Sequence, residues 1–214
     1  MLIASAALIV VVLVIVVVTT RNATSASAGA PGSELTHTFL FADLVGFTAL
    51  AELEGDERAL EVALELQRRT RGLLLKHRAE QVKAIGDGLM LRSSNAYDTI
   101  RLGVRLARDL AGQASFPPLR IGIHTGPALC RNGDWYGGTV NIAARLCAIA
   151  PAGGVIISEA TRSTADRMTD LEWGDRELQR LRNLSQPIAT YRVSTTRPSA
   201  RRRPRAPRSP AINR

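Results

Sequence analysis

The sequence predicts one α+β domain whose core follows the order βαββαβ and is extended at its C-terminal side by further helices and strands. Apolar runs with the spacing of strands and leucine-rich segments with helical spacing alternate in this order from Thr36 onward. The 214 residues, 45% of them hydrophobic and 22% charged, allow one domain of about 150 residues with appendages. The βαββαβ order is that of the ferredoxin-like unit, which supports many activities, so function has to be argued from particular residues.

The first half of the domain is predicted from three local patterns. Residues 36–43, THTFLFAD, have the apolar character of a strand and end on an acidic residue. Leucines recur at helical spacing over about 56–77, which predicts a helix. Residues 81–93, QVKAIGDGLMLRS, predict a β-hairpin, because Asp87-Gly88 between two apolar runs is a strong two-residue turn signal.

The second half of the domain is predicted to alternate helices and strands. Residues 95–114 show an amphipathic helical pattern, and residues 117–130, PPLRIGIHTGPALC, have the pattern of a strand that enters a glycine turn. The elements expected after them are a helix at 137–150, a strand at 153–158, a helix at 158–167 and closing strands at 171–178 and 188–193.

The N-terminal end predicts a membrane anchor. Residues 2–18 carry no charge, and with the two threonines after them they reach the length of about 20 residues that a spanning helix needs. A cleaved secretory signal is the weaker alternative, because no basic side chain precedes the apolar run. We therefore expect a transmembrane anchor at 1–20 and a linker rich in Ser, Ala and Gly at 21–34. Arg21 favours a single-pass protein of the cell membrane with its folded domain in the cytoplasm.

The net charge of +9 has a local origin. Residues 196–214 hold seven arginines and no acidic residue, so the rest of the chain carries only about +2. We expect no specific nucleic-acid partner, because the folded domain at 35–195 is close to neutral. A segment of arginine and proline cannot bury a core, so 196–214 is predicted to be a disordered basic tail.

Three residues with reactive side chains are interpreted as structural. His124 lies in an apolar predicted strand, which is typical of a buried core histidine. Cys130 and Cys147 have no metal-ligand spacing, so both are expected to be reduced thiols.

Four segments together resemble the catalytic domain of class III adenylyl and guanylyl cyclases, over roughly Leu35–Val193. Any one of them alone has an ordinary structural explanation, but independent accidents would rarely produce all of them in one order with fixed spacings. The segments are FADLVGFTAL at 41–50, VKAIGDGLML at 82–91, RIGIHTG at 120–126 and GDWYGGTVNIAARL at 133–146. The resemblance implies the class III nucleotide cyclase fold for the predicted α+β domain.

The resemblance also implies a metal centre. Asp43 and Asp87, with the backbone carbonyl of Leu44, would bind two divalent cations, Mg²⁺ or Mn²⁺, which are hard ions that prefer oxygen ligands. Two such ions about 3.5 to 4 Å apart can activate an attacking hydroxyl group and neutralise the leaving oxygens. The reaction implied is the conversion of ATP to cyclic AMP, in which the ribose 3′-hydroxyl displaces pyrophosphate from the α-phosphorus.

Two further residues are implied to be catalytic. Asn141 and Arg145 are four residues apart in a predicted helix, so they share one face and can reach one substrate. By resemblance, Asn141 would hold the ribose and Arg145 would meet the charge that grows on the α-phosphate, a role suited to the planar donors of a guanidinium group. Arg182 is the nearest basic candidate for binding the polyphosphate.

Base selection is implied for Lys83 and Asp134, and elementary chemistry supports it. Adenine presents an acceptor at N1 and a donor at N6, and a lysine can only donate while an ionised aspartate can only accept. Guanine reverses this pattern, which would leave both groups mismatched. The pair therefore favours ATP over GTP.

The resemblance implies a homodimer. The metal aspartates would come from one subunit, and the base-selecting pair, Asn141 and Arg145 would come from the other. One chain holds both sets, so a two-fold dimer would complete two equivalent sites. A membrane anchor would favour pairing by raising the local concentration.

Three alternatives are weighed against an adenylate cyclase. A guanylate cyclase would need a base-selecting pair other than Lys83 and Asp134. A diguanylate cyclase would carry a GG(D/E)EF motif, which the chain lacks. A catalytically weak cyclase-homology domain could serve as a membrane-tethered interaction module, but all six main site positions hold functional residue types.

Overall fold

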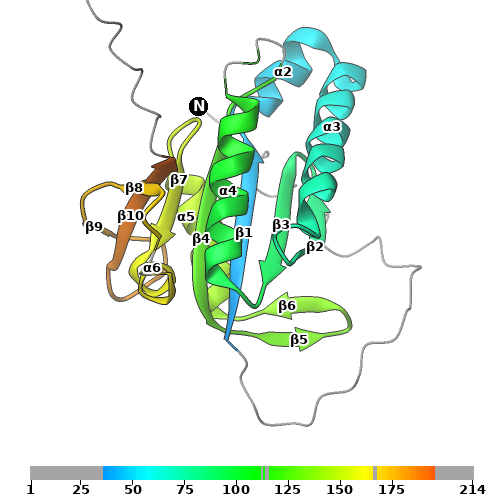
Figure 1. Ribbon diagram of the computed structural model, residues 1–214. Coiled ribbons are helices and arrows are strands. Elements are labelled where there is room, and N and C mark those ends of the chain that lie inside the picture. The colour runs from blue at the N-terminus through cyan, green and yellow to red at the C-terminus, as the bar shows by residue number, and fades with distance from the viewer. Residues whose placement is uncertain (1–35, 112, 114–115, 166–167, 196–214) are drawn as a thin grey trace, which may run out of the picture. The chain divides into compact units, whose positions relative to one another are not determined.

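The computed structural model describes residues 36–111, 113, 116–165 and 168–195 (Figure 1). The predicted anchor at 1–20, the linker at 21–34 and the tail at 196–214 lie outside the described residues. None of the described helices is both long enough and apolar enough to cross a membrane.

Eight of the described strands form the main sheet. They are β1 (Thr36–Leu44), β2 (Ala79–Ile85), β3 (Gly88–Ser93), β4 (Leu119–Pro127), β7 (Val155–Ser158), β8 (Leu171–Trp173), β9 (Glu177–Gln179) and β10 (Ile188–Thr195). Their order is β2-β3-β1-β4-β7-β10-β8, and β9 pairs with β10. β1 is antiparallel to both β3 and β4, whereas β4 and β7 are parallel. The predicted βαββαβ core with a C-terminal extension is confirmed.

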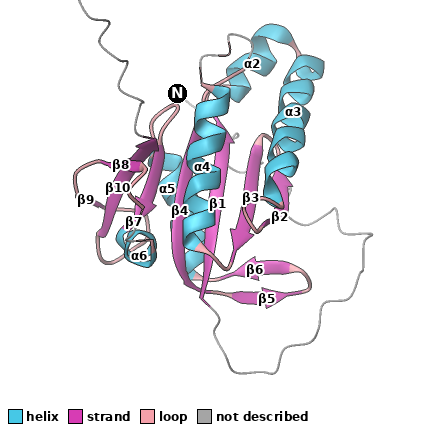
Figure 2. Ribbon diagram, viewed as in Figure 1, coloured by secondary structure: helices cyan, strands magenta, loops and turns pink. Residues whose placement is uncertain are grey.

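The described helices cover both faces of this sheet (Figures 1 and 2). They are α2 (Phe47–Glu54), α3 (Asp56–Leu74), α4 (Ala96–Leu110), α5 (Gly138–Ile149) and α6 (Glu159–Thr164). Figure 2 shows α4 in front of β1 and β4, with α5 behind the same strands, and both helices contact β4. Because helices cover both faces, the central strands are buried on both sides and read as continuous apolar runs.

The side chains of β1 alternate between two apolar layers, as they must in a pleated strand. Leu40 and Ala42 belong to the larger core, which α3 and α4 complete. Phe39 and Phe41 belong to a smaller cluster on the other face, together with residues of α5. Asp43 follows Phe39 and Phe41 at steps of two residues, so its side chain is on the α5 side of the sheet.

The hairpin predicted at 81–93 is confirmed, but its turn is one residue earlier than expected. Ile85 pairs with Gly88, so the two turn residues are Gly86 and Asp87. Gly86 has a φ of 58°, a left-handed conformation that glycine accepts without the penalty of a Cβ. The prediction of an Asp87-Gly88 turn was wrong because Gly86, and not Gly88, is the glycine with the left-handed conformation in this turn.

A second hairpin was missed. β4 ends at Pro127, before the predicted end at residue 130, and the chain then forms β5 (Leu129–Arg131) and β6 (Asp134–Tyr136). The turn is Asn132-Gly133, with φ angles of 53° and 77°. Positive φ at both positions is the requirement of a type I′ turn, for which Asn-Gly is a preferred pair, so the signal was present in the sequence.

The helices differ from the predictions mainly at their ends. The helix predicted at 56–77 ends at Leu74, and the unpredicted α2 precedes it, separated by Gly55 with a φ of 89°. The helix predicted at 95–114 begins as expected, because the Asn95 side chain accepts a hydrogen bond from the Asp98 N–H at 3.1 Å and caps it. It ends at Leu110. α5 is Gly138–Ile149 where 137–150 was predicted, and α6 is Glu159–Thr164 where 158–167 was predicted.

The later strands differ in the same way. The strand predicted at 153–158 begins at Val155, two short strands, β8 and β9, stand where one was predicted at 171–178, and β10 continues to Thr195, beyond the predicted end at 193.

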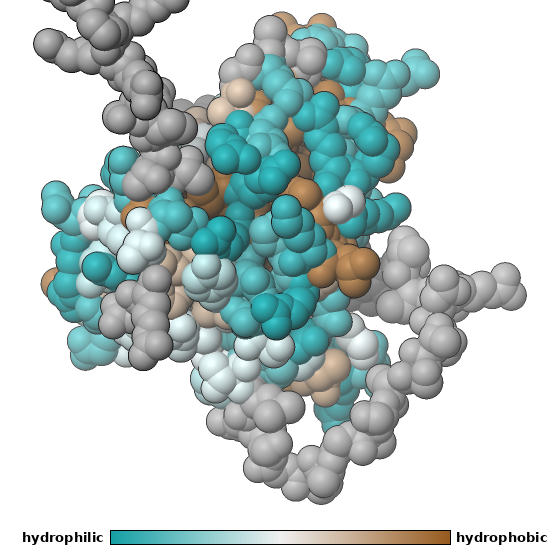
Figure 3. Space-filling view, viewed as in Figure 1, coloured by the Kyte–Doolittle hydropathy of each residue, from teal (hydrophilic) through white to brown (hydrophobic). Residues whose placement is uncertain are grey.

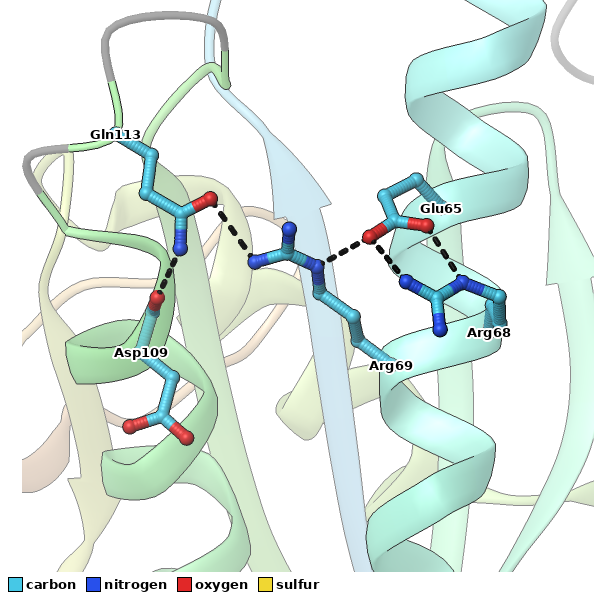
Figure 4. Close-up of polar contacts among 5 residues, drawn as sticks. All are labelled: Glu65, Arg68, Arg69, Asp109 and Gln113. Atoms are coloured by element: carbon cyan, nitrogen blue, oxygen red, sulfur yellow. Dashed lines mark hydrogen bonds and ion pairs between the residues drawn. The ribbon is translucent and has the colours of Figure 1, made fainter.

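A polar network joins α3 to the chain that follows α4 (Figure 4). Glu65 accepts hydrogen bonds from Arg68 and Arg69 on its own helix. Arg69 also donates to Gln113 Oε1 at 2.9 Å, and Gln113 donates to the Asp109 backbone carbonyl. These bonds hold α3 beside α4 on the face of the sheet opposite α5.

Apolar side chains reach the surface beside α2 and α3. Figure 3 shows apolar atoms among the hydrophilic surface of these two helices. The exposed leucines in and after the helices are Leu53, Leu60, Leu64 and Leu75. Nothing in the described part of the chain covers them.

Candidate active site

Asp43 and Asp87 lie next to each other at one end of the sheet. Asp43 is in β1 and Asp87 is in the turn between β2 and β3, and they meet because β1 pairs with β3 in a register that sets Ala42 opposite Leu89. Gly88 leaves room for the Asp43 carboxylate, since a Cβ at this position would lie 3.3 Å from Asp43 Oδ1. The structure therefore brings the two predicted metal aspartates together.

These two carboxyl groups destabilise each other when both are ionised. Burial raises the pKa of Asp87 to about 6, and the Asp43 carboxylate adds to the rise. A divalent cation between them would favour both charged forms. No group of three or more His, Cys, Asp or Glu side chains that could hold a metal occurs in the described ranges. A cation here would therefore use two carboxylates and complete its shell with other oxygens, which is the usual arrangement for Mg²⁺ with a phosphate substrate.

Leu44, the third predicted ligand, is at the end of β1. Its side chain is buried in the larger core, so only its backbone is available to a metal. The Leu44 backbone N–H donates a hydrogen bond to the Asp87 carboxyl group, which places the backbone of Leu44 beside the same centre. The residues present fit a divalent cation with oxygen ligands.

Arg120 is a member of this centre that the sequence reasoning did not single out. It lies in β4 directly opposite Asp43 of β1, and its Nε donates to Asp43 Oδ2 at 2.8 Å while its Nη2 contacts the same oxygen. Arg120 Nη1 also lies 3.4 Å from the Ala148 carbonyl in α5. The only sequence signal was its place in RIGIHTG. The contact itself depends on the register of β1 against β4.

Lys83 and Asp134 are also brought together, from β2 and β6. Lys83 Nζ donates to both carboxylate oxygens of Asp134, at 2.8 and 2.7 Å, across 51 positions of sequence. Both side chains are about one-third exposed, so a ligand can reach them. Burial alone would raise the pKa of Asp134, but hydrogen bonds from Lys83 and from the Trp135 N–H bring this pKa below its ordinary value. Asp134 is therefore ionised at neutral pH and acts only as an acceptor.

α5 carries Asn141 and Arg145 along the face of the sheet that bears Asp43. Asn141 is exposed and Arg145 is partly buried, and neither side chain hydrogen-bonds to another residue in the described part of the chain. α5 approaches β4 closely because Gly122 has no side chain, and a Cβ there would lie 2.0 Å from the Cys147 backbone nitrogen. The position of both predicted catalytic residues therefore depends on this glycine.

Arg182 is the predicted site residue with the weakest connection to the others. It is exposed in the turn between β9 and β10. The preceding Leu181 packs in one cluster with Leu146 and Ala150, so the turn lies beside α5. No hydrogen bond or ion pair joins Arg182 to another predicted site residue within the described ranges, and its role stays a prediction.

The chain matches a known protein family over most of its length. The family model of the adenylate and guanylate cyclase catalytic domain matches residues 33–194. The chain belongs to this family. The match covers the four motifs and every residue of the candidate site.

Individual relatives of this cyclase domain support the same assignment. The chain is 32% identical over 177 residues to a pH-sensitive adenylate cyclase of Mycobacterium tuberculosis, covering 80% of this chain and 44% of that protein. It is 34% identical over 120 residues to an adenylate cyclase of Streptomyces griseus, covering 56% of this chain and 30% of that protein. The chain therefore spans less than half the length of these curated relatives.

The fold of the cyclase domain is also shared with solved structures. An adenylate cyclase from Trypanosoma brucei, determined in its monomeric state, superposes with a TM-score of 0.70 at 22% identity. The superposition covers 79% of this chain and 92% of that one. At this identity the likeness shows the fold, and the class III cyclase fold is thereby confirmed.

The three residues interpreted as structural agree with their predictions, since His124 is buried and both cysteines are free thiols. His124 is buried, its Nδ1 lies 2.6 Å from Ser158 Oγ, and burial lowers the pKa of His124 to about 4, so the ring is neutral. Cys147 is buried, and burial raises the pKa of its thiol to about 12. Cys130 is a free thiol as predicted and is exposed in β5.

Proposed function

We propose that this chain is an adenylate cyclase that converts ATP to 3′,5′-cyclic AMP and pyrophosphate in cyclic nucleotide signalling. The ion pair between Lys83 and Asp134 carries the proposal, because it presents donors and acceptors side by side at a partly exposed place. The adjacent carboxylates of Asp43 and Asp87 support it, because they supply the acidic centre that the reaction needs.

The ion pair suits adenine for a simple reason of hydrogen-bond capacity. A lysine ammonium has three donors and an ionised carboxylate has about four acceptor positions, so each keeps free capacity after their two mutual bonds. Lys83 would donate to adenine N1 and Asp134 would accept from N6. A guanine bound in the same orientation would set a donor against Lys83 and an acceptor against Asp134, which costs binding free energy because both groups then lose their partners.

The reaction proposed here forms one bond and breaks one. The ribose 3′-oxygen bonds to the α-phosphorus, its proton passes to solvent, and the bond from the α-phosphorus to the bridging oxygen breaks to release pyrophosphate. Asp43, Asp87 and the Leu44 carbonyl would hold two divalent cations, Mg²⁺ or Mn²⁺, which when bound lower the pKa of the hydroxyl and neutralise the leaving group. Asn141 would orient the ribose, and Arg145 would stabilise charge on the α-phosphate.

A homodimer is part of the proposal. Within one chain the acidic centre and the base-selecting pair are separate, since no hydrogen bond or ion pair within the described ranges joins the acidic centre to Lys83 or Asp134. Asn141 and Arg145 make no described hydrogen bond to the aspartates. A two-fold dimer would set the acidic centre of one copy against Lys83, Asp134 and α5 of the other and would complete two equivalent sites.

The domain limits and the location are proposed on the sequence alone. We propose a single-pass anchor at 1–20 that holds the catalytic domain, 35–195, on the cytoplasmic side of the cell membrane, where ATP is available. The uncharged run at 2–18 and Arg21 support this. The basic tail at 196–214 is given no role.

A turnover assay on the purified full chain tests the activity. With Mn²⁺ and either ATP or GTP, we expect cyclic AMP from ATP and a kcat/KM for ATP at least about 100-fold above that for GTP. Preferential formation of cyclic GMP would make the chain a guanylate cyclase. Turnover of neither nucleotide would favour the interaction-module alternative.

A charge reversal at Lys83 tests the observation that carries the proposal. Lys83→Glu should lower the ratio of kcat/KM for ATP over GTP by about 100-fold, because the donor facing adenine N1 becomes an acceptor. Lys76→Glu is the matched control, since Lys76 is the only other lysine of the chain and is exposed after α3. An unchanged ratio in Lys83→Glu would remove the basis of the adenine assignment.

A further inference from the structure

The hairpin that carries Asp134 is not part of the main sheet. β5 and β6 form a two-stranded sheet of their own, and in the described part of the chain no backbone ladder joins them to the strands beside them. The place of Asp134 relative to Lys83 therefore depends on side-chain contacts. Small shifts of this hairpin would change the position of the Asp134 carboxylate relative to a bound base.

Trp135 makes the contacts that fasten this hairpin to the sheet. Successive side chains of a strand point to opposite faces, so Trp135 points away from the face that Asp134 occupies. Its ring lies edge-to-face with His37 at 4.3 Å and with Phe39 at 5.7 Å between ring centroids. The Arg92 guanidinium carbon lies 4.7 Å from the centroid of the same ring. The four residues come from β1, β3 and β6.

Arg92 is itself held in place on both sides. It donates from Nη1 to His37 Nδ1 at 2.7 Å and from Nε to Glu80 of β2. Because arginine can only donate, His37 Nδ1 is an acceptor and the buried His37 ring is neutral. Burial and the Arg92 charge both lower the pKa of His37, which keeps the ring neutral at physiological pH.

The clamp of His37, Phe39 and Arg92 on Trp135 is connected directly to the base-selecting group. The Trp135 backbone N–H donates to Asp134 Oδ1 at 2.8 Å, and Lys83 approaches the same carboxylate from β2. We propose that Trp135 is a positioning residue for base selection, which holds Asp134 in register with Lys83 and thereby sets the preference for adenine. This inference rests on the proposed adenylate cyclase function.

A role in packing alone makes a different prediction from a role in positioning. Trp135 packs beside the cluster of Phe39, Met90 and Ala143, so its removal would lower stability in either case. Loss of packing alone would reduce the active fraction and lower turnover of ATP and GTP equally. Loss of positioning would change KM more than kcat and would alter the ratio between the two nucleotides.

Steady-state kinetics of the full chain with Mn²⁺ and ATP or GTP separate these roles. In Trp135→Leu we expect KM for ATP to rise about tenfold, kcat to change less than about threefold, and the ATP over GTP ratio of kcat/KM to fall about tenfold. Trp135→Phe keeps an aromatic ring for Arg92 and His37 and should restore most of the ratio. Tyr97→Leu is the control. It removes an aromatic ring whose centroid lies 4.6 Å from the Arg101 guanidinium carbon, and both residues are on α4, away from the candidate site.

A second variant keeps the inference testable if Trp135→Leu does not fold. Arg92→Met keeps Trp135 and removes the cation above its ring, and the ATP over GTP ratio should fall about threefold. An unchanged ratio in the folded Trp135 or Arg92 variant, beside a selective wild-type enzyme, would overturn the inference and leave the proposed function standing. A wild-type chain that turns over neither nucleotide would overturn both.

Discussion

Gly122 controls how closely the helix with the two predicted catalytic residues approaches the sheet. A Cβ at Gly122 would lie 2.0 Å from the Cys147 backbone nitrogen and 2.5 Å from the Ala143 carbonyl oxygen. Ordinary contacts of a Cβ begin near 3.4 Å, so α5 would have to move away by about 1.4 Å. β4 cannot yield instead, because it pairs with β1 on one side and with β7 on the other.

Gly122→Ala is therefore expected to damage both stability and catalysis. Overpacking of a core costs typically 1 to 3 kcal/mol, and because the clash here is with backbone atoms we expect the free energy of unfolding to fall by about 3 kcal/mol. A displacement of about 1 Å at a catalytic group can cost about 100-fold in rate, so kcat should fall by that factor through Asn141 and Arg145. Urea unfolding followed by circular dichroism and initial rates of cyclic AMP formation measure the two effects.

Gly103→Ala is the matched control for this experiment. Its Cβ would meet the ends of flexible side chains, with Ile123 Cδ1 at 3.0 Å and Leu40 Cδ1 at 3.2 Å, on the α4 face of the sheet. We expect a change in the free energy of unfolding below about 1 kcal/mol, because alanine also favours the helix, and an unchanged kcat. Wild-type stability and turnover in Gly122→Ala would refute the close packing of α5 on β4.

Three further predictions follow from single residues. Asp87→Asn should abolish turnover and weaken Mn²⁺ binding at least about tenfold in calorimetry, because a charged oxygen ligand is lost; equal affinity in the variant would contradict the metal assignment. The pKa of His124 is about 4 in the folded chain against 6.5 when unfolded, so the unfolded chain binds more protons between these values. The contribution of His124 to stability is complete above pH 6.5 and falls by up to about 3 kcal/mol toward pH 4. Because the raised pKa of Asp87, about 6, changes stability in the opposite direction over this range, the loss is measured as the difference between the urea unfolding curves of the wild type and His124→Gln. An unchanged pH slope in the variant would show that His124 makes no such contribution. Gly72→Ala in exposed α3 has nothing within 4 Å of its Cβ and should raise the free energy of unfolding by about 0.5 to 1 kcal/mol, whereas a decrease would indicate an unseen contact.

Local patterns were sufficient to predict most elements of this domain. The strand at 36–43, the hairpin at 81–93 and the start of α4 at Asn95 depend on residues close together in sequence, and all three are confirmed. α2 was missed because Gly55 separates it from the longer apolar pattern of α3. The β5–β6 hairpin was missed although Asn132-Gly133 signalled it, because its strands are only three residues long.

The identities of the candidate site residues were also available from sequence motifs, but their contacts were not. Whether Arg120 can donate to the Asp43 carboxylate depends on the register of β1 against β4, and the whole buried face of the sheet determines this register. The meeting of Lys83 with Asp134 across 51 positions depends on how a separate hairpin packs on the sheet, and Trp135 holds it there through residues of β1 and β3. A motif specifies which side chains are present, whereas their distances result from the packing of many residues far apart in the chain.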